Sequence, residues 1–334
     1  RIVSDANSCV NLIERALDEL RVESTKKVNL DDLDESQRGA VELPFKAARV
    51  LAPAGSGKTR VLINRSVYLA NEGFHENRVL ALAFNREAKD EMVARLKDKE
   101  LTKIEVRTFH SFGLSLLQND VGIRFSRDPK GIEWSDAYWR KLQWLIQSVG
   151  VDTPKGPKVP ERMRAAMQHI KNELRTPGQC LAEVCNSTVR FRNVLTELMP
   201  KWSKAFEDFL QWQIKSEFLT FADMVYLAVR KLAEDNELRR EYQGKYDAIL
   251  VDEFQDLNAA QHTLIRILAC PHEHLFVVGD DDQMIYGWLG ALPKPIIKFP
   301  ETYAGSVGIT LSVNYRCAGK IVHHTNWLIT HNKD

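Results

Sequence analysis

The hydrophobic positions alternate between short apolar runs and amphipathic stretches over the first hundred residues of the chain. Apolar runs of strand length cover residues 47–52, 78–84 and 104–108. The pattern after the first run predicts a helix from Lys58, and the pattern after the second predicts a helix over 85–97. Short buried strands that alternate with helices predict a parallel sheet with helices on both faces.

The alternation then stops for more than a hundred residues before it returns. Between residues 114 and 244 the apolar residues keep the helical period. Strand-like runs then follow at residues 248–251, 275–278 and 309–313. Because later strands can pack beside earlier ones, we expect a single α/β domain that is interrupted by an all-helical insertion.

These patterns divide the chain into five predicted parts. Residues 1–32 are an extension with one amphipathic helix, 33–113 the first part of the sheet domain, 114–220 the helical insertion, 221–316 the second part of the sheet domain, and 317–334 a final segment with one helix.

Composition narrows the class of protein. The chain has 334 residues, 44% of them hydrophobic and 27% charged, which is typical of globular domains. No apolar run reaches the roughly 18 residues of a membrane span and no signal pattern opens the chain, so we expect a cytoplasmic protein without a membrane partner. The five cysteines show no paired spacing and are expected to be reduced. Since the net charge is only +1, contacts with nucleic acid must be local.

A glycine-bearing loop lies between the first predicted strand and the helix from Lys58. Residues 52–59 read Ala-Pro-Ala-Gly-Ser-Gly-Lys-Thr. Gly55 and Gly57 let the backbone curl so that its N–H groups point at phosphate oxygens, Lys58 adds a positive charge, and Thr59 offers a hydroxyl to Mg²⁺. The expected phosphate-binding residues are Ala54, Gly55, Ser56, Gly57, Lys58 and Thr59.

An apolar strand that ends in carboxylates supplies the other half of this site. Residues 249–256 read Ile-Leu-Val-Asp-Glu-Phe-Gln-Asp. Two adjacent carboxylates suit one to hold Mg²⁺ and the other to polarise an attacking water. Together with the glycine loop, this strand predicts a P-loop site that binds and hydrolyses a nucleoside triphosphate.

Four further segments accompany these two motifs in a fixed order. They are Leu33–Gln37, Thr108–His110, Val278–Ala291 and Leu311–Arg316. From about residue 31 to residue 332, the chain closely resembles the UvrD/Rep-type superfamily 1 DNA helicases. The resemblance implies a RecA-like sheet domain that binds ATP with Mg²⁺ and translocates 3′ to 5′ on single-stranded DNA, with roles in DNA repair or replication.

The resemblance also implies roles for individual residues around the nucleotide. Gln37 would read the adenine edge, because an amide has both a donor and an acceptor. Tyr315 would stack on the adenine ring, and Arg60 would line the same pocket.

For catalysis, the resemblance implies that Lys58 acts together with residues from three other motifs. Asp252 would hold Mg²⁺, and Glu253 would be the base that orients the attacking water. Gln283 would sense the γ-phosphate, and Arg316 would neutralise the charge that builds during transfer.

Single-stranded DNA would cross the top of the same domain. Aromatic residues at strand ends face the edge where α/β sheets bind ligands. The expected DNA-binding residues are Phe84, Asn85, Thr108, Phe109, His110, Tyr286 and Trp288. Leu289 stands where the family usually has arginine, so one contact expected there is either missing or supplied elsewhere.

The resemblance implies more chain than this sequence holds. A second RecA-like domain would begin in residues 317–334, so we expect an N-terminal part of a longer helicase that acts on single strands and duplex junctions. Two alternatives remain open. One is the motor part of a helicase-nuclease, and the other is a nucleotide-gated DNA clamp that does not hydrolyse ATP. The intact Glu253, Gln283 and Arg316 argue against the clamp.

Overall fold

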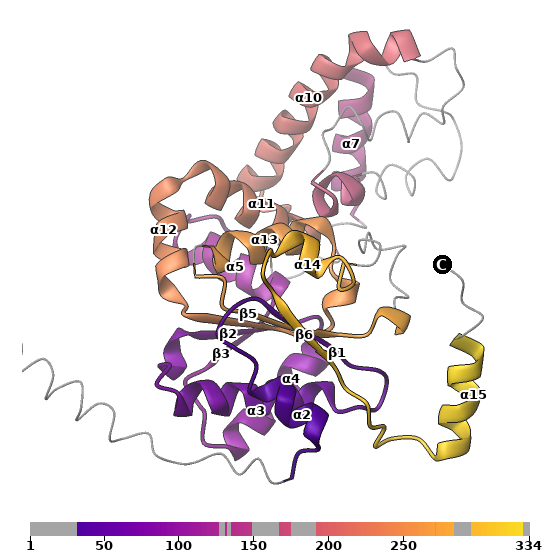
Figure 1. Cartoon of the computed structure of the whole chain (residues 1–334). Helices are drawn as coiled ribbons and strands as arrows, with labels where there is room; N and C mark the ends of the chain where they lie inside the picture. The colour runs from indigo at the N-terminus through magenta and orange to yellow at the C-terminus, as the bar shows by residue number, and fades with distance from the viewer. Residues whose placement is uncertain are drawn as a thin grey trace, which may run out of the picture.

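The computed structural model describes residues 32–126, 131, 135–148, 167–174, 192–270, 272–283 and 295–329. At its centre is a six-stranded sheet, all parallel, with the order β3-β2-β4-β5-β1-β6 (Figure 1). The strands are β1 (Ala48–Leu51), β2 (Val79–Ala83), β3 (Glu105–Thr108), β4 (Ala248–Val251), β5 (Leu275–Gly279) and β6 (Val307–Thr310). The predicted parallel α/β sheet is therefore confirmed.

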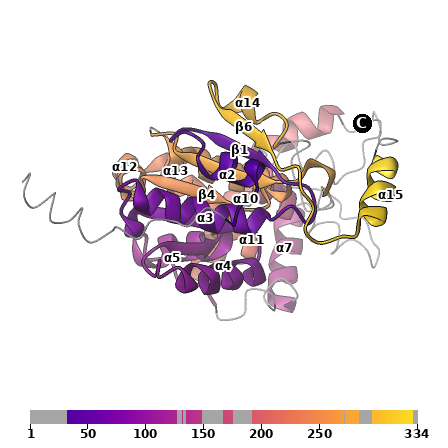
Figure 2. The same cartoon turned by 60° about the horizontal axis from the view of Figure 1, so that its bottom comes forward.

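Helices cover both faces of this sheet, as Figures 1 and 2 show from two sides. Below the sheet in Figure 1 lie α2 (Glu35–Val41), α3 (Lys58–Asn71) and α4 (Arg86–Asp98). Above it lie α5 (Phe109–Asn119), α11 (Phe221–Glu234), α12 (Asn236–Lys245), α13 (Ala259–Ala269) and the short α14 (Phe299–Thr302). Single turns are η1 (Glu76–Arg78), η3 (Phe254–Asp256) and η4 (Asp281–Gln283).

The two helical layers bury two separate hydrophobic clusters against the sheet. In β4, Ile249 and Val251 belong to the cluster under α5, α11 and α13, whereas Ala248 and Leu250 belong to the cluster over α2, α3 and α4. This alternation follows from the pleat of a strand. Because the central strands are buried on both faces, they read as continuous apolar runs in the sequence.

Within the described residues, the predicted elements agree with the structure except near the last strand and the start of the insertion. The helix that was expected in the N-terminal extension lies outside the described residues. The last strand was expected at 309–313 but covers Val307–Thr310. Leu311 N still bonds to Leu51 O at 2.8 Å, and the chain beyond it turns to the glycine loop instead of the sheet. The helical pattern was expected from residue 114, yet α5 begins at Phe109 directly after β3, with the Thr108 side chain as its N-cap.

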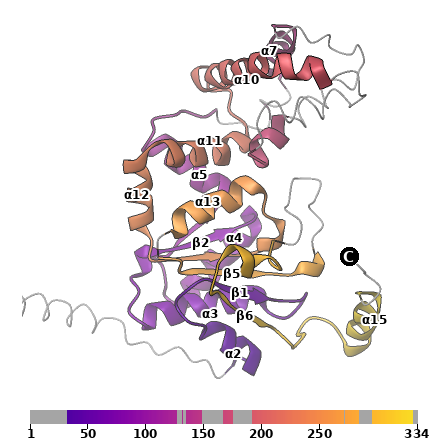
Figure 3. The same cartoon turned by 45° about the horizontal axis from the view of Figure 1, so that its top comes forward.

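The helical insertion leaves the sheet domain after α5 and returns at α11. Within it, α7 (Asp136–Ser148) and α10 (Arg192–Lys215) pack against each other and project away from the sheet (Figure 3). Helix α5 packs along α11, so we assign α5 to the sheet domain and place the start of the insertion after Asn119. Helix α11 begins at Phe221, where the sequence predicts the return.

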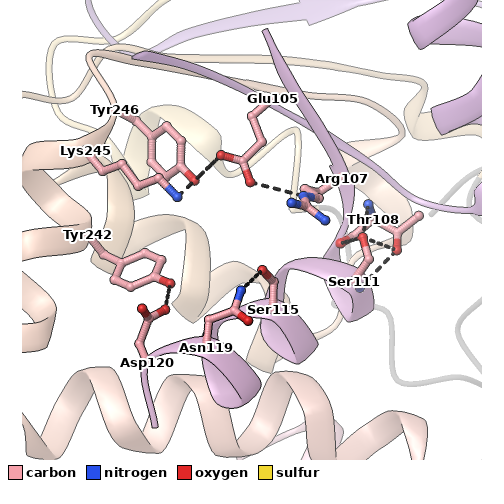
Figure 4. A network of polar contacts seen from close by, with 10 residues as sticks. All are labelled: Glu105, Arg107, Thr108, Ser111, Ser115, Asn119, Asp120, Tyr242, Lys245 and Tyr246. Carbon is pink, nitrogen blue, oxygen red and sulfur yellow. Dashed lines mark hydrogen bonds and ion pairs between the residues drawn. The ribbon is translucent and has the colours of Figure 1, made fainter. Parts of the chain in front are cut away.

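A polar network fastens the chain on either side of the insertion (Figure 4). Tyr246 donates a hydrogen bond of 2.8 Å to Glu105 on β3, and Lys245 lies 3.5 Å from the same carboxylate. Tyr242 of α12 donates to Asp120 at the end of α5. The two segments that flank the insertion are thus held together independently of the insertion itself.

A buried ion pair joins the insertion to the sheet domain. Lys171 Nζ lies 2.5 Å from Asp223 Oδ1, and both side chains are almost completely inaccessible to solvent. Gln213 of α10 accepts a hydrogen bond from Lys171 and donates one to Asp223. Asp223 also accepts hydrogen bonds from the backbone and hydroxyl of Thr220, which caps α11. One carboxylate therefore connects three helical segments.

The last helix, α15 (Gly319–Ile329), lies apart from the sheet (Figure 1). Its apolar side chains are exposed, with Trp327 61% and Leu328 66% accessible. In the described part of the chain, no helix has the length and hydrophobicity that a membrane crossing requires. Cys270 and Cys317 are free thiols, and the other three cysteines lie outside the described residues.

We expect the substitution Gly113→Ala to lower the free energy of unfolding by about 1 to 3 kcal/mol. A Cβ at this position of α5 would lie 2.4 Å from the carbonyl oxygen of Met224 in α11, so the two helices would have to separate. Urea denaturation measures the change. The control is Gly244→Ala in α12, where nothing lies within 4 Å of the new atom and stability should change by less than about 1 kcal/mol. Equal midpoints for Gly113→Ala and wild type would contradict this packing.

Candidate functional site

The glycine loop has the backbone conformation that its sequence predicts. Gly55 and Gly57 have φ angles of 80° and 92°, which residues with a Cβ rarely adopt. Gly57 directly precedes α3, whose first residue is Lys58 as expected. The N-terminus of α3 therefore faces the loop, and such a terminus favours a bound phosphate group.

Side chains from two segments that are distant in the sequence pack closely against the two glycines. A Cβ on Gly57 would lie 2.7 Å from Gln37 Nε2, and a Cβ on Gly55 would lie 2.7 Å from the Cβ of Arg316. Gln37 comes from α2, and Arg316 follows β6. The structure thus brings these two predicted residues against the loop from opposite ends of the sequence.

Gln37 lies against the backbone of the glycine loop. It is completely buried and donates a hydrogen bond of 2.8 Å from Nε2 to the carbonyl oxygen of Ser56. Its Oε1 is buried without a hydrogen-bond partner among the described residues. A buried acceptor without a donor is costly, so this atom fits an amino group such as that of adenine.

Tyr315 and Arg60 lie beside Gln37. The Tyr315 hydroxyl donates to Asp34 Oδ2 at 2.6 Å, while Asp34 Oδ1 caps α2 by accepting from the backbone N–H of Gln37. The Tyr315 side chain is 54% exposed, which leaves its ring accessible for stacking. Arg60 donates to the carbonyl oxygen of Asp32 at 2.7 Å. Asp34 therefore links the hydroxyl of Tyr315 to the backbone N–H of Gln37.

Asn314 is a loop-binding residue that the sequence analysis missed. Its Nδ2 donates to the carbonyl oxygen of Ala54 at 2.7 Å, and its Oδ1 accepts from the backbone of Arg316 and Cys317. Tyr315 N also donates to Gly55 O at 2.8 Å. These bonds hold the segment after β6 against the glycine loop. In the sequence, the only indication of this role is that Asn314 directly precedes Tyr315 and Arg316.

The carboxylates after β4 form the charged part of the site. Asp252 is 4% exposed, and Glu253 has a left-handed φ of 47°, a strained conformation for a residue with a side chain. Lys58 Nζ lies 3.4 Å from Glu253 Oε2. Burial, and then the charge of Glu253, raises the pKa of Asp252 to about 7. The same two causes raise the pKa of Asp256 to about 6.

This set of side chains fits Mg²⁺. Oxygen ligands are those that Mg²⁺ prefers. Asp252 offers a carboxylate at the end of β4, and Thr59 a hydroxyl in the first turn of α3. The raised pKa of Asp252 shows that its negative charge is poorly compensated by the protein alone. A divalent cation would supply that compensation.

Gln283 and Arg316 follow β5 and β6, two strands that lie on the same side of β4 in the sheet. Gln283 Nε2 donates to the carboxylate of Asp280, which is 4% exposed and directly follows β5. Arg316 is exposed on the segment that follows β6. The predicted nucleotide and catalytic residues therefore follow β1, β4, β5 and β6 at a single edge of the sheet, apart from Gln37 of α2, which reaches the same edge.

The predicted DNA-binding residues that follow β2 and β3 also lie at this edge. Ala83 of β2 pairs with Thr108 of β3, so the residues that follow each strand are neighbours. Phe84 is half-buried, and Asn85 is exposed and caps α4 through its side chain. His110 is half-buried against Phe221, and desolvation lowers its pKa to about 4, so it is neutral at pH 7.

Phe109 does not fit a direct contact with DNA. Its side chain is completely buried in the core above the sheet, because it is the first residue of α5 and its side chain points inward. Tyr286, Trp288 and Leu289 lie outside the described residues.

Asp252 makes the folded state less favourable as the pH rises. Its carboxyl ionises near pH 4 in an unfolded chain but keeps its proton up to about pH 7 in the fold. Between these values the folded state binds more protons than the unfolded state, so the free energy of unfolding falls with increasing pH. We expect Asp252→Asn to stabilise the protein by about 1 to 3 kcal/mol more at pH 8 than at pH 5.

Urea denaturation without Mg²⁺ at the two pH values measures this difference. Asp136→Asn is the control, because that carboxylate on α7 is 89% exposed. The control should change stability equally at both pH values. If Asp252→Asn raised the free energy of unfolding equally at pH 5 and pH 8, the surrounding protein would have to compensate the charge of Asp252 well, and the prediction would be wrong.

Comparisons with known proteins identify the family of this chain. Residues 33–304 match the family of the UvrD/REP helicase N-terminal domain. An ATP-dependent DNA helicase PcrA from Staphylococcus epidermidis is 32% identical over 308 residues, which are 91% of this chain and 40% of that protein. An ATP-dependent DNA helicase Rep from Buchnera aphidicola is 29% identical over 306 residues, 90% of this chain and 45% of that protein. The chain thus spans less than half the length of these curated relatives. Through its match over most of its length, the chain belongs to the UvrD/REP helicase family and contains the N-terminal domain of that family.

Proposed function

We propose that this chain is the first motor domain of an ATP-dependent DNA helicase, which binds ATP with Mg²⁺ and moves along single-stranded DNA. The observation that carries this proposal is the convergence of four motifs at one edge of the sheet. The glycine loop, Asp252 with Glu253, Gln283, and the segment 314–316 follow four different strands and face the same place.

Nucleotide binding would use groups that are already in position. The phosphates would bind at the N–H groups of residues 54–59 and at Lys58. The base would lie between the Tyr315 ring and the Arg60 side chain, with its amino group donating to Gln37 Oε1. Both ends of this site are held by Asp34 and Asn314, so binding would require little ordering.

Hydrolysis would depend on the balance between Lys58 and Glu253. The lysine contacts the carboxylate at 3.4 Å, and phosphate oxygens would draw the lysine toward themselves. Glu253 would then be free to accept a proton from an attacking water. Arg316, exposed beside Gly55, would neutralise charge on the γ-phosphate. Mg²⁺, held by Asp252 and Thr59, would supply charge neutralisation at the phosphate oxygens.

The DNA strand would cross the edge formed by β2 and β3. Phe84 and Trp288 would stack on bases, with Tyr286 beside them, and Asn85, Thr108 and His110 would line the sugar-phosphate backbone. The neutral His110 would contribute a hydrogen bond there, not a charge. We propose 3′ to 5′ movement along the strand and action at duplex junctions, on the strength of the family resemblance.

A second RecA-like domain is part of this proposal. The relatives extend well beyond the matched region, and the site edge of this chain leaves Arg316 and Tyr315 exposed. A second domain packed there would add the further arginine that the resemblance implies. In phosphoryl-transfer enzymes, an arginine of that kind raises the rate of hydrolysis about 10³- to 10⁵-fold. Turnover by this chain alone would therefore be slow.

The substitutions Lys58→Ala and Glu253→Gln should affect different steps. We expect Lys58→Ala to weaken nucleotide binding about 10- to 100-fold, because it removes a charge-assisted contact with phosphate. Glu253→Gln should leave binding within about 3-fold of wild type while the hydrolysis rate falls at least about 100-fold, because it removes the base. A fluorescent-nucleotide titration and single-turnover hydrolysis separate the two effects. Equal losses of affinity in both variants would exclude Glu253 as the base.

Trp288 should contribute a large part of the affinity for single strands. A base stacked on an aromatic ring contributes about 1 to 3 kcal/mol, so Trp288→Ala should weaken binding about 5- to 150-fold. Fluorescence anisotropy with a labelled oligonucleotide over a salt series measures this, since stacking depends less on salt than phosphate contacts do. Trp327→Ala is the matched control, because this tryptophan is 61% exposed and belongs to α15, which lies apart from the sheet. Wild-type binding by Trp288→Ala at all salt concentrations would remove Trp288 from the DNA path.

A further inference from the structure

Gln255 is a buried amide at the centre of the catalytic edge, and neither the motif analysis nor the family match assigns it a role. It lies in η3, directly after β4, and is 1% exposed. Its side chain reaches from the segment that carries Glu253 to the end of β5. A buried amide has to satisfy both of its ends, so the partners at the two ends define what it does.

The oxygen end of this amide is fixed by the backbone. Gln255 Oε1 accepts a hydrogen bond of 3.0 Å from the backbone N–H of Asp280. A Cβ at the preceding Gly279 would lie 2.4 Å from the same oxygen, so only glycine permits this approach. Because a backbone N–H can only donate, Oε1 must face Asp280 and Nε2 must face the opposite way.

The nitrogen end therefore faces the catalytic carboxylate. Gln255 Nε2 donates to Glu253 Oε2 at 2.8 Å and, at the longer distance of 3.4 Å, to Asp256 Oδ2. Lys58 Nζ lies 3.4 Å from the same oxygen of Glu253. The two donors on Oε2 set the rotation of the carboxylate. Oε1 is left as the oxygen that the described residues do not hold.

The contacts continue from Asp280 to the residue that would sense the γ-phosphate. The Asp280 carboxylate accepts from Gln283 Nε2 and, at 3.1 Å, from the backbone of Asp282. Glu253, Gln255, Asp280 and Gln283 thus form one continuous chain of hydrogen bonds. A shift of Gln283 would move Asp280, and Asp280 is bonded to the amide that orients Glu253.

We propose that Gln255 is a positioning residue that orients Glu253 and connects it to Gln283, an inference that rests on the proposed function. Of the residues of similar size, only glutamine can donate to Glu253 and accept from the backbone N–H of Asp280 at the same time. Glutamate would place an acceptor against Glu253 and add a like charge, and methionine would keep the length of the side chain but lose both hydrogen bonds. Asparagine is one methylene shorter and could not reach both partners.

The first test compares Gln255→Met with wild type in this chain. Nucleotide affinity, measured with a fluorescent ATP analogue, should stay within about 3-fold, because Gln255 contacts neither the glycine loop nor Gln37. Single-turnover hydrolysis should slow about 10- to 100-fold, the usual effect of removing a group that orients a catalytic residue. Gln255→Glu should slow it further, because the added charge repels Glu253.

The matched control is Gln261→Met. Gln261 is also a buried glutamine, 4% exposed, but its hydrogen bonds among the described residues are with Asn258, where it caps α13, and not with Glu253. This variant should lower the melting temperature and leave the hydrolysis rate within about 2-fold of wild type. A general loss of packing would instead slow both methionine variants to the same degree, and that outcome would overturn the proposal.

A second test places Gln255→Met in a Glu253→Gln background. If Gln255 acts through the carboxylate, the substitution should have no further effect on the residual rate. A full additional loss, or wild-type hydrolysis by Gln255→Met alone, overturns the role of Gln255 and leaves the proposed function intact. Binding of the fluorescent ATP analogue by the wild-type chain that is no tighter than binding by Lys58→Ala would overturn the proposed function and this inference together.

Discussion

The parallel direction of all six strands is the constraint on which the site depends. Because every strand ends at the same edge, segments that are hundreds of residues apart in sequence meet there. Leu51 of β1 pairs with Gly279 on one side and Thr310 on the other, so the glycine loop emerges between the segments that follow β5 and β6. Reversal of any one of these strands would remove a motif from the edge.

This edge collects negative charge at a cost to stability. Asp252, Glu253, Asp256 and Asp280 lie near one lysine, and burial raises the pKa of three of these carboxyls. The strained backbone of Glu253 adds to the cost. The apolar strands β4 and β5, buried on both faces, offset it. The arrangement suits a site whose charges are compensated by a bound ligand and its cation. Because such a ligand would bind the folded chain more tightly than the unfolded chain, its binding would stabilise the fold.

The sequence predicts what depends on local pattern and fails where distant side chains decide. Strand β4 and the start of α3 agree with expectation because a buried apolar run and a glycine loop are local signals. Phe109 was misread because an aromatic residue after a strand has the same local signature whether it faces a ligand or begins a helix. Gln255 and Asn314 were missed because their partners, at Asp280 and Ala54, become neighbours only in the folded sheet.

The ion pair between Lys171 and Asp223 limits how the insertion can move. Separation of the two would leave a charge without a partner in the interior, at a cost of about 3 to 5 kcal/mol. The base of the insertion and the start of α11 are therefore expected to move as one rigid unit. A load applied to α7 or α10 would be passed through α11 to α5 and the sheet beneath it, and would not be dissipated by bending at the junction.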